Sequence, residues 1–127
     1  MQLLIKNAKL RNQEALVDIA IDGGLIQAVG KDVGQQADRV IDVGGALVTP
    51  ALIDPHIHLD KVNIFDVVRK NESGTLKEAI EIIWDKKKTY TDEDVLERSS
   101  DVVYKALKNG TLFMRTHVDV DTIGGLK

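Results

Sequence analysis

The segment that decides the fold reads Thr49-Pro50-Ala51-Leu52-Ile53-Asp54-Pro55-His56-Ile57-His58-Leu59-Asp60. Its apolar start predicts a buried strand that begins at residue 51. A proline inside a central strand removes a ladder hydrogen bond, so Pro55 is expected at a strand end or a bulge. Side chains on a strand alternate between the two faces of the sheet, and His56 and His58 are therefore expected to point the same way.

This pair of histidines is the strongest chemical signal in the chain. Two imidazoles one strand step apart can bind one metal ion, and neutral imidazole suits zinc, iron and similar divalent ions. Asp54 and Asp60 are close enough in sequence to orient the imidazoles. The spacing also arises by chance, and the alternative is two surface histidines on a loop. Their place at the carboxyl end of an apolar strand favours a site, because α/β folds place active sites there.

The residues that follow predict a strand–helix–strand crossover. An irregular connection over residues 61–74 leads to a helix that starts at Thr75, where Glu78 completes a capping box. A second helix starts at Thr91 and stops at Asn109-Gly110, and residues 111–120 are typical of a strand. The order implies a parallel pair of strands. Helical spacing predicts the buried face of the first helix, made of Leu76, Ala79, Ile80 and Ile83.

The first fifty residues have the pattern of short strands. Apolar or alternating runs occur over residues 3–5, 15–21, 25–29 and 39–42. Asp22-Gly23-Gly24 separates the second run from the third and predicts a hairpin. This part of the chain is expected to form a small, mostly antiparallel β unit.

Composition excludes several classes of protein. The 127 residues are 43% hydrophobic and 29% charged, which is typical of a globular chain. A net charge of −3 argues against a strongly basic nucleic-acid binder. No apolar run approaches the roughly 18 residues of a membrane span, and the N-terminus has no signal-peptide pattern. We therefore expect neither a nucleic-acid nor a membrane partner, and a cytoplasmic location. Cysteine is absent, so disulfides and thiolate metal sites are excluded.

Residues 49–60 resemble the first metal-binding strand of the amidohydrolase superfamily, and the preceding hairpin resembles its N-terminal β unit. Three segments in order resemble the cytosine deaminase branch, which also contains triazine-ring and related amide hydrolases. They are Pro55-His56-Ile57-His58-Leu59-Asp60, Ser73-Gly74-Thr75-Leu76 and Arg115-Thr116-His117-Val118-Asp119-Val120. The resemblance covers nearly all of the chain.

The resemblance implies an α/β fold in two parts. Residues 1–50 would be the N-terminal part of a small β-sandwich domain, and residues 51–127 the start of a (β/α)8 TIM-type barrel. A complete barrel takes about 250 residues, so the residues after Pro50 supply little more than the first two strand–helix units. We therefore expect an incomplete barrel, from a truncated reading frame, a proteolytic fragment or a deliberately shortened chain.

The function implied for the parent protein is metal-dependent hydrolysis, as in a cytosine-like deaminase. A metal-activated hydroxide would break an exocyclic C–N bond of a small nitrogen heterocycle, with one divalent ion, zinc or iron, as cofactor. His56 and His58 match the first two metal ligands. Leu76 matches a position that lines the heterocycle pocket, although the first core leucine of a capped helix explains it equally well. The other ligands and the proton-shuttling glutamate come from later strands in the family, so no catalytic residue is expected here and the chain alone is expected to be inactive.

Three further residues are expected to support the ligands or line the pocket: Asp60, His117 and Asp119. Period two places His117 and Asp119 on one face of the second strand, where the alternative is a satisfied buried pair in the barrel interior. A different hypothesis is a complete, non-catalytic protein whose exposed sheet edges are covered by self-association or a partner. A third is a structural metal protein that uses all three histidines with Asp60 or Asp119. Structural zinc usually recruits cysteine, which disfavours the third hypothesis.

Overall fold

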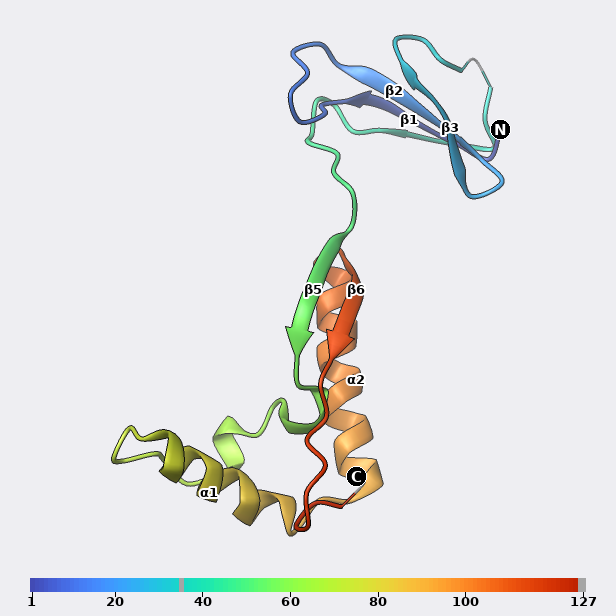
Figure 1. Ribbon diagram of the computed structural model, residues 1–127. Coiled ribbons are helices and arrows are strands. Elements are labelled where there is room, and N and C mark those ends of the chain that lie inside the picture. The colour runs from blue at the N-terminus through green and yellow to red at the C-terminus, as the bar shows by residue number, and fades with distance from the viewer. Residues whose placement is uncertain (35, 126–127) are drawn as a thin grey trace. The chain divides into compact units, whose positions relative to one another are not determined.

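The computed structural model describes residues 1–34 and 36–125 of the chain. It divides into two compact units, Met1–Pro50 and Ala51–Lys127 (Figure 1). Over the described residues, no helix is both long enough and apolar enough to cross a membrane.

The first unit is a four-stranded sheet. Its strands are β1 (Leu3–Ala8), β2 (Val17–Asp22), β3 (Leu25–Gly30) and β4 (Arg39–Asp42), in the spatial order β3-β2-β1-β4. The predicted hairpin of β2 and β3 is confirmed, and Gly23 and Gly24 turn it with φ angles of +59° and +74°. β1 pairs antiparallel with β2 but parallel with β4, so the sheet is mixed. Its buried apolar residues are Leu4, Ala8, Ile19 and Ala20.

The second unit is a parallel strand pair with helices between its strands. Strand β5 (Leu52–Ile57) pairs with β6 (Thr111–Thr116), and the predicted parallel crossover is confirmed. The register advances three residues on β5, from Asp54 to Ile57, and two on β6, from Met114 to Thr116. The extra residue forms a bulge, which is one of the two arrangements expected at Pro55.

Four helical segments separate the two strands. They are the 3-10 turns η1 (Leu59–Lys61) and η2 (Phe65–Val67) and the helices α1 (Leu76–Lys87) and α2 (Asp92–Lys108). The connection predicted as irregular thus contains two short turns. In Figure 1, α2 runs alongside β5 and β6.

The threonines predicted to start the helices, Thr75 and Thr91, are the N-caps of α1 and α2, which begin one residue later. The Thr75 hydroxyl accepts from the Glu78 N–H at 3.3 Å, and the Thr91 hydroxyl accepts from the Asp94 N–H at 3.1 Å. The capping box of α1 is not reciprocal, because the Glu78 carboxylate accepts from the N–H of Ser73, at 2.7 Å, and not from that of Thr75. Helix α2 ends at Lys108 with Asn109 as its C-cap, and Gly110 follows with a φ angle of +88°.

The predicted buried face of α1 is wrong. Leu76 is 76% exposed and Ile80 is 40% exposed, whereas the buried residues of this helix are Ile82 and Lys87. Helical spacing identifies an apolar face, but it does not say whether another part of the chain covers that face. Here the face borders an open cavity.

Candidate active site

His56 and His58 come together at the carboxyl end of β5. His56 lies in the bulged part of the strand, and His58 follows the strand as the residue before η1. The prediction that the two side chains point the same way assumed that both residues lie on one regular strand. The structure shows that they do not. The bulge and the turn nevertheless place the two Nε2 atoms 3.2 Å apart. Two imidazole nitrogens bound tetrahedrally to one zinc ion, at about 2.0–2.1 Å each, would be separated by roughly 3.3 Å. The pair thus fits a shared divalent ion.

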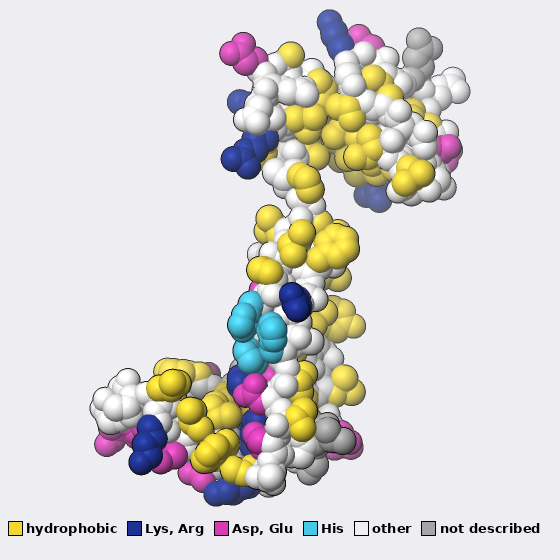
Figure 2. All heavy atoms as spheres, viewed as in Figure 1, with side chains coloured by type: hydrophobic (Ala, Val, Ile, Leu, Met, Phe, Trp, Pro, Cys, Tyr) yellow, Lys and Arg dark blue, Asp and Glu magenta, His cyan; other side chains and the backbone are white. Residues whose placement is uncertain are grey.

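His117 joins this pair from the neighbouring strand. Strand β6 ends at Thr116, so His117 and Asp119 lie in the segment after the strand, contrary to the expectation that both are strand residues. The N–H of His117 donates to the Ile57 carbonyl at 2.7 Å, and its ring centroid lies 4.3 Å from that of His56. Figure 2 shows the histidines as one patch. His117 and Asp119 are part-exposed, which does not match a fully buried pair.

The histidine patch does not supply a complete ligand set. Across residues 1–34 and 36–125, no group of three or more His, Asp or Glu side chains is arranged to hold a metal ion. The described residues therefore give no support to a structural site built from all three histidines. The ring of His117 packs against His56 at the edge of the pair.

Two carboxylates flank the other nitrogen of His58. Its Nδ1 lies 3.6 Å from Oδ1 of Asp119 and 3.9 Å from Oδ1 of Asp60. Asp60 is 4% exposed, and its Oδ2 accepts from the Asp119 N–H at 3.3 Å. Within the described part of the chain, His58 Nδ1 and Asp60 Oδ1 are buried without a hydrogen-bond partner. Carboxylates placed behind a metal-binding imidazole orient the ring and select its tautomer. Asp54 does not share this role, because its carboxylate accepts from the backbone N–H of His56.

Two lysines hold the segment that carries Asp119. Nζ of Lys61 pairs with Oδ2 of Asp119 and holds the pKa of that carboxyl below its usual range. Lys87 pairs with Oδ2 of Asp121 at 2.6 Å. The N–H of Gly124 and the Lys87 ammonium lower the pKa of Asp121 to about 2. Neither lysine has a role that was predicted from the sequence. A signal for Lys87 was available, because this cation lies four residues after Ile83 on the apolar face of α1.

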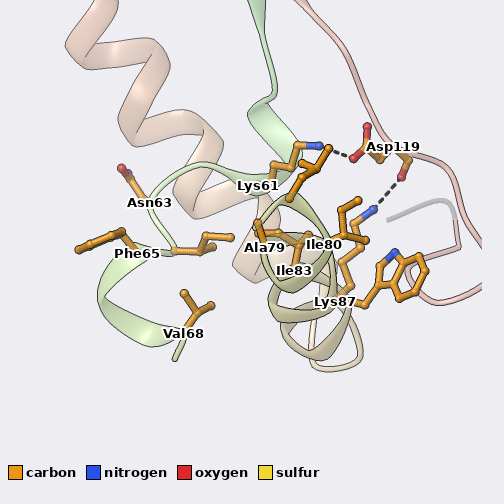
Figure 3. Close-up of a pocket in the computed structure, with 12 residues that line it drawn as sticks. Lys61, Asn63, Phe65, Val68, Ala79, Ile80, Ile83, Lys87 and Asp119 are labelled. Atoms are coloured by element: carbon orange, nitrogen blue, oxygen red, sulfur yellow. Dashed lines mark hydrogen bonds and ion pairs between the residues drawn. The ribbon is translucent and has the colours of Figure 1, made fainter. Parts of the chain in front are cut away.

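A cavity of about 540 Å³ lies between α1 and the segment that contains η2 (Figure 3). Its walls are mainly apolar, and Phe65, Ile80, Ile83 and Trp84 contribute to them. Figure 3 shows the pair of Lys61 and Asp119 beside these walls, so the cavity adjoins the carboxylate that faces His58. Pockets of this size and composition are typical of small-molecule sites.

Leu76, the residue predicted to contact the heterocycle, also lines this cavity. Phe65 and Trp84 also line the cavity, and neither was predicted from the sequence as a pocket residue. A lone aromatic residue on an apolar helix face gives no sequence signal that separates packing from ligand contact.

A family model described as "Amidohydrolase family" matches residues 39–127. The chain therefore belongs to the amidohydrolase family. N-isopropylammelide isopropyl amidohydrolase from Pseudomonas sp. (strain ADP) is 31% identical over 129 residues, which cover 98% of this chain and 32% of that protein. The chain thus spans about a third of the length of this relative.

Solved structures show the same relationship. The 5-methylcytosine deaminase from Klebsiella pneumoniae, liganded with 5-fluorocytosine, matches with a TM-score of 0.80 and 36% identity, over 91% of this chain and 29% of that one. A mutant of atrazine chlorohydrolase TrzN from Arthrobacter aurescens TC1, complexed with zinc and atraton, matches with a TM-score of 0.68 and 26% identity, over 91% and 28%. The predicted resemblance to the N-terminal portion of cytosine deaminase-like amidohydrolases is confirmed, and with it the α/β fold of an incomplete barrel.

Proposed function

We propose that this chain is the N-terminal part of a cytoplasmic, metal-dependent amidohydrolase that removes an exocyclic amino group from a cytosine-like heterocycle. The observation that carries the proposal is the 3.2 Å separation of the His56 and His58 Nε2 atoms at the carboxyl end of a parallel strand. The likeness to a 5-methylcytosine deaminase and to an isopropylammelide amidohydrolase supports the reaction class. In this proposal residues 1–50 belong to a small β-sandwich domain and residues 51–127 begin the barrel.

His56 and His58 would hold one divalent ion, zinc or iron. When bound, the ion supplies an activated water molecule for hydrolysis at neutral pH. Asp60 and Asp119 hold the Nδ1 side of His58, which keeps its Nε2 available as a ligand. The zinc complex of the 26% identical chlorohydrolase supports a divalent ion at this position. Two imidazoles fall short of the usual three protein ligands of a catalytic zinc site, so we propose that the chain is inactive by itself.

The apolar cavity beside Asp119 would receive the heterocycle. Its volume of about 540 Å³ is within the usual range for small ligands and leaves room for a substituted ring. Leu76 and Trp84 would contact the flat faces of the ring, because apolar and aromatic surfaces stack on heterocycles. The polar residues that line the same cavity are Lys61, Asn63, Lys87 and Asp119.

A second candidate function is association without catalysis. Large apolar side chains on β5 and β6 are exposed, among them Leu52, Ile53 and Phe113. Exposed apolar surface of this kind marks an interface or a docking site. A self-associating chain would cover it.

Calorimetric titration of zinc into the 127-residue chain tests the proposal. We expect one ion per chain, and we expect His56→Ala and His58→Ala each to weaken binding at least a hundredfold. His117→Ala is the matched control and should bind zinc within about tenfold of the wild type. Unchanged zinc affinity in both His56→Ala and His58→Ala would contradict the proposal. A longer product of the same reading frame should release ammonia from cytosine-like rings only when His56 and His58 are present.

A further inference from the structure

Lys87 is a buried cation near the end of α1. It is 4% exposed, whereas the neighbouring Lys88 has a side chain that is 62% exposed. An ammonium group loses its hydration when it is buried, so it persists in that position only with close polar partners. The polar partners of Lys87 therefore indicate which part of the chain the buried ammonium group holds in place.

Both partners of Lys87 lie in the segment that follows β6. Its Nζ donates to Oδ2 of Asp121 at 2.6 Å and to the carbonyl of Asp119 at 3.2 Å. The other carboxylate oxygen of Asp121 accepts from the N–H groups of Ile123 and Gly124, so the segment folds into a turn around this carboxylate. The turn packs closely on the lysine, because a Cβ atom at Gly124 would lie 3.2 Å from Cδ of Lys87.

Asp119 is thereby fixed from several directions. Lys87 binds its carbonyl, Asp60 accepts from its N–H, and Lys61 binds its Oδ2. The remaining oxygen, Oδ1, faces Nδ1 of His58 at 3.6 Å. A continuous set of contacts therefore runs from α1 to the imidazole.

We propose that Lys87 is a positioning residue that holds the Asp119 carboxylate against His58. The negative charge of this carboxylate, 3.6 Å from Nδ1, favours the proton of His58 on Nδ1 and leaves Nε2 as the lone-pair nitrogen beside His56. Lys87 touches neither histidine and acts only through Asp119. Its effect on metal binding rests on the proposed function, whereas its effect on the tautomer does not. The helix that lines the cavity and the metal-binding pair are thus joined through one buried cation.

Ring nitrogen NMR of the metal-free chain at pH 8 tests this directly. In the wild type we expect His58 to be protonated on Nδ1, and in Lys87→Met we expect a mixture of the two tautomers. The dissociation constant for Co²⁺, read from its visible absorption, should rise about tenfold or more in Lys87→Met. Lys88→Met is the matched control, because its side chain pairs with Asp85 on the surface, and it should change neither readout.

Asp121→Asn provides an independent test. It keeps an acceptor oxygen for the turn but removes the ion pair with Lys87, so both readouts should shift as in Lys87→Met. Circular dichroism establishes whether each variant is folded. A folded variant with an unchanged His58 tautomer would overturn the proposal, and so would loss of fold in both variants, which would make Lys87 a structural residue. A wild-type chain that fails to bind Co²⁺ would contradict the proposed function, and the tautomer would still decide the role of Lys87.

Discussion

The Nε2 atoms of His56 and His58 face each other at 3.2 Å, although one residue lies in a bulged strand and the other beyond its end. Without an ion, this distance allows one imidazole N–H to donate to the other nitrogen. With an ion, it allows both nitrogens to be ligands. The same geometry therefore serves the metal-free and the metal-bound chain.

Zinc should stabilise the folded chain through these histidines. At a free zinc concentration a hundred times the dissociation constant, one site adds about 2.7 kcal/mol to the free energy of unfolding. Urea denaturation with zinc and with a chelator measures the difference. His56→Ala should abolish this zinc-dependent increase in the free energy of unfolding, and His117→Ala should retain most of it. An increase in His56→Ala equal to that of the wild type would show that zinc binds elsewhere.

Arg98 should stabilise the turn that carries Asp60. Its guanidinium donates to the carbonyl of Val62 at 2.8 Å and to that of Asp60 at 3.3 Å, and its side chain is 10% exposed. Hydrogen bonds to a charged group contribute about 1.5–3 kcal/mol. Arg98→Met should therefore lower the free energy of unfolding by about 2 kcal/mol in urea denaturation.

Lys105→Met on the same helix is the control for Arg98. Lys105 forms an exposed pair with Asp101, and such pairs contribute less than about 1 kcal/mol. Equal losses of stability in the two variants would show that the contacts of Arg98 with the turn contribute nothing measurable.

Stability should fall in acid partly because of Glu78. Hydrogen bonds from Ser73 and Arg69 lower its pKa from 4.5 to about 2. A lowered pKa in the folded state favours folding above the unfolded-state pKa, and this contribution is lost as pH falls from about 4.5 towards about 2. Urea denaturation across this pH range should show that the free energy of unfolding falls less steeply with acid in Glu78→Gln than in the wild type. Glu81→Gln, one turn further along α1, should follow the wild type. The same dependence of the free energy of unfolding on pH in all three chains would show that Glu78 does not make this contribution.

Ligand binding in the cavity should be measurable by tryptophan fluorescence, because Trp84 lines the cavity and is the single tryptophan of the chain. A cytosine-like heterocycle that enters the cavity should change the emission of Trp84 at saturation. Ile80→Asp places a charge on the apolar wall and should weaken binding at least tenfold, a loss of about 1.4 kcal/mol. Leu107→Asp on α2, outside this cavity, should leave binding unchanged. Identical affinities for the heterocycle in all three chains would show that it does not bind in this cavity.

Local signals predicted most of the fold. The glycines after Asp22, the caps at Thr75 and Thr91, and the stop at Gly110 all act within a few residues, so they can be recognised in a single sequence. The parallel crossover followed from the order of the elements. The bulge at Pro55 followed from the missing backbone N–H of proline.

The candidate site was less predictable, because its contacts join distant parts of the chain. The proximity of Asp119 to His58 depends on where β6 ends and on how the following segment turns, and neither leaves a periodic pattern. Lys87 is one of three consecutive lysines in the sequence, and its burial and its contacts with Asp119 and Asp121 distinguish it only in the structure. The apolar face of α1 was correctly identified but was wrongly expected to be covered.

The parallel pairing of β5 and β6 also determines how the second unit folds. Because the strands run in the same direction, residues 58–110 must form a closed loop before the ladder can begin. Helix α2 ends at Lys108, directly before β6, so these two neighbours can associate early, whereas β5 must join them from a distant part of the chain. His56 lies on that late-joining strand and His58 directly follows it, so both meet His117 only when the ladder closes. Refolding should therefore be limited by loop closure, and assembly of the histidine patch should report the final, slowest step.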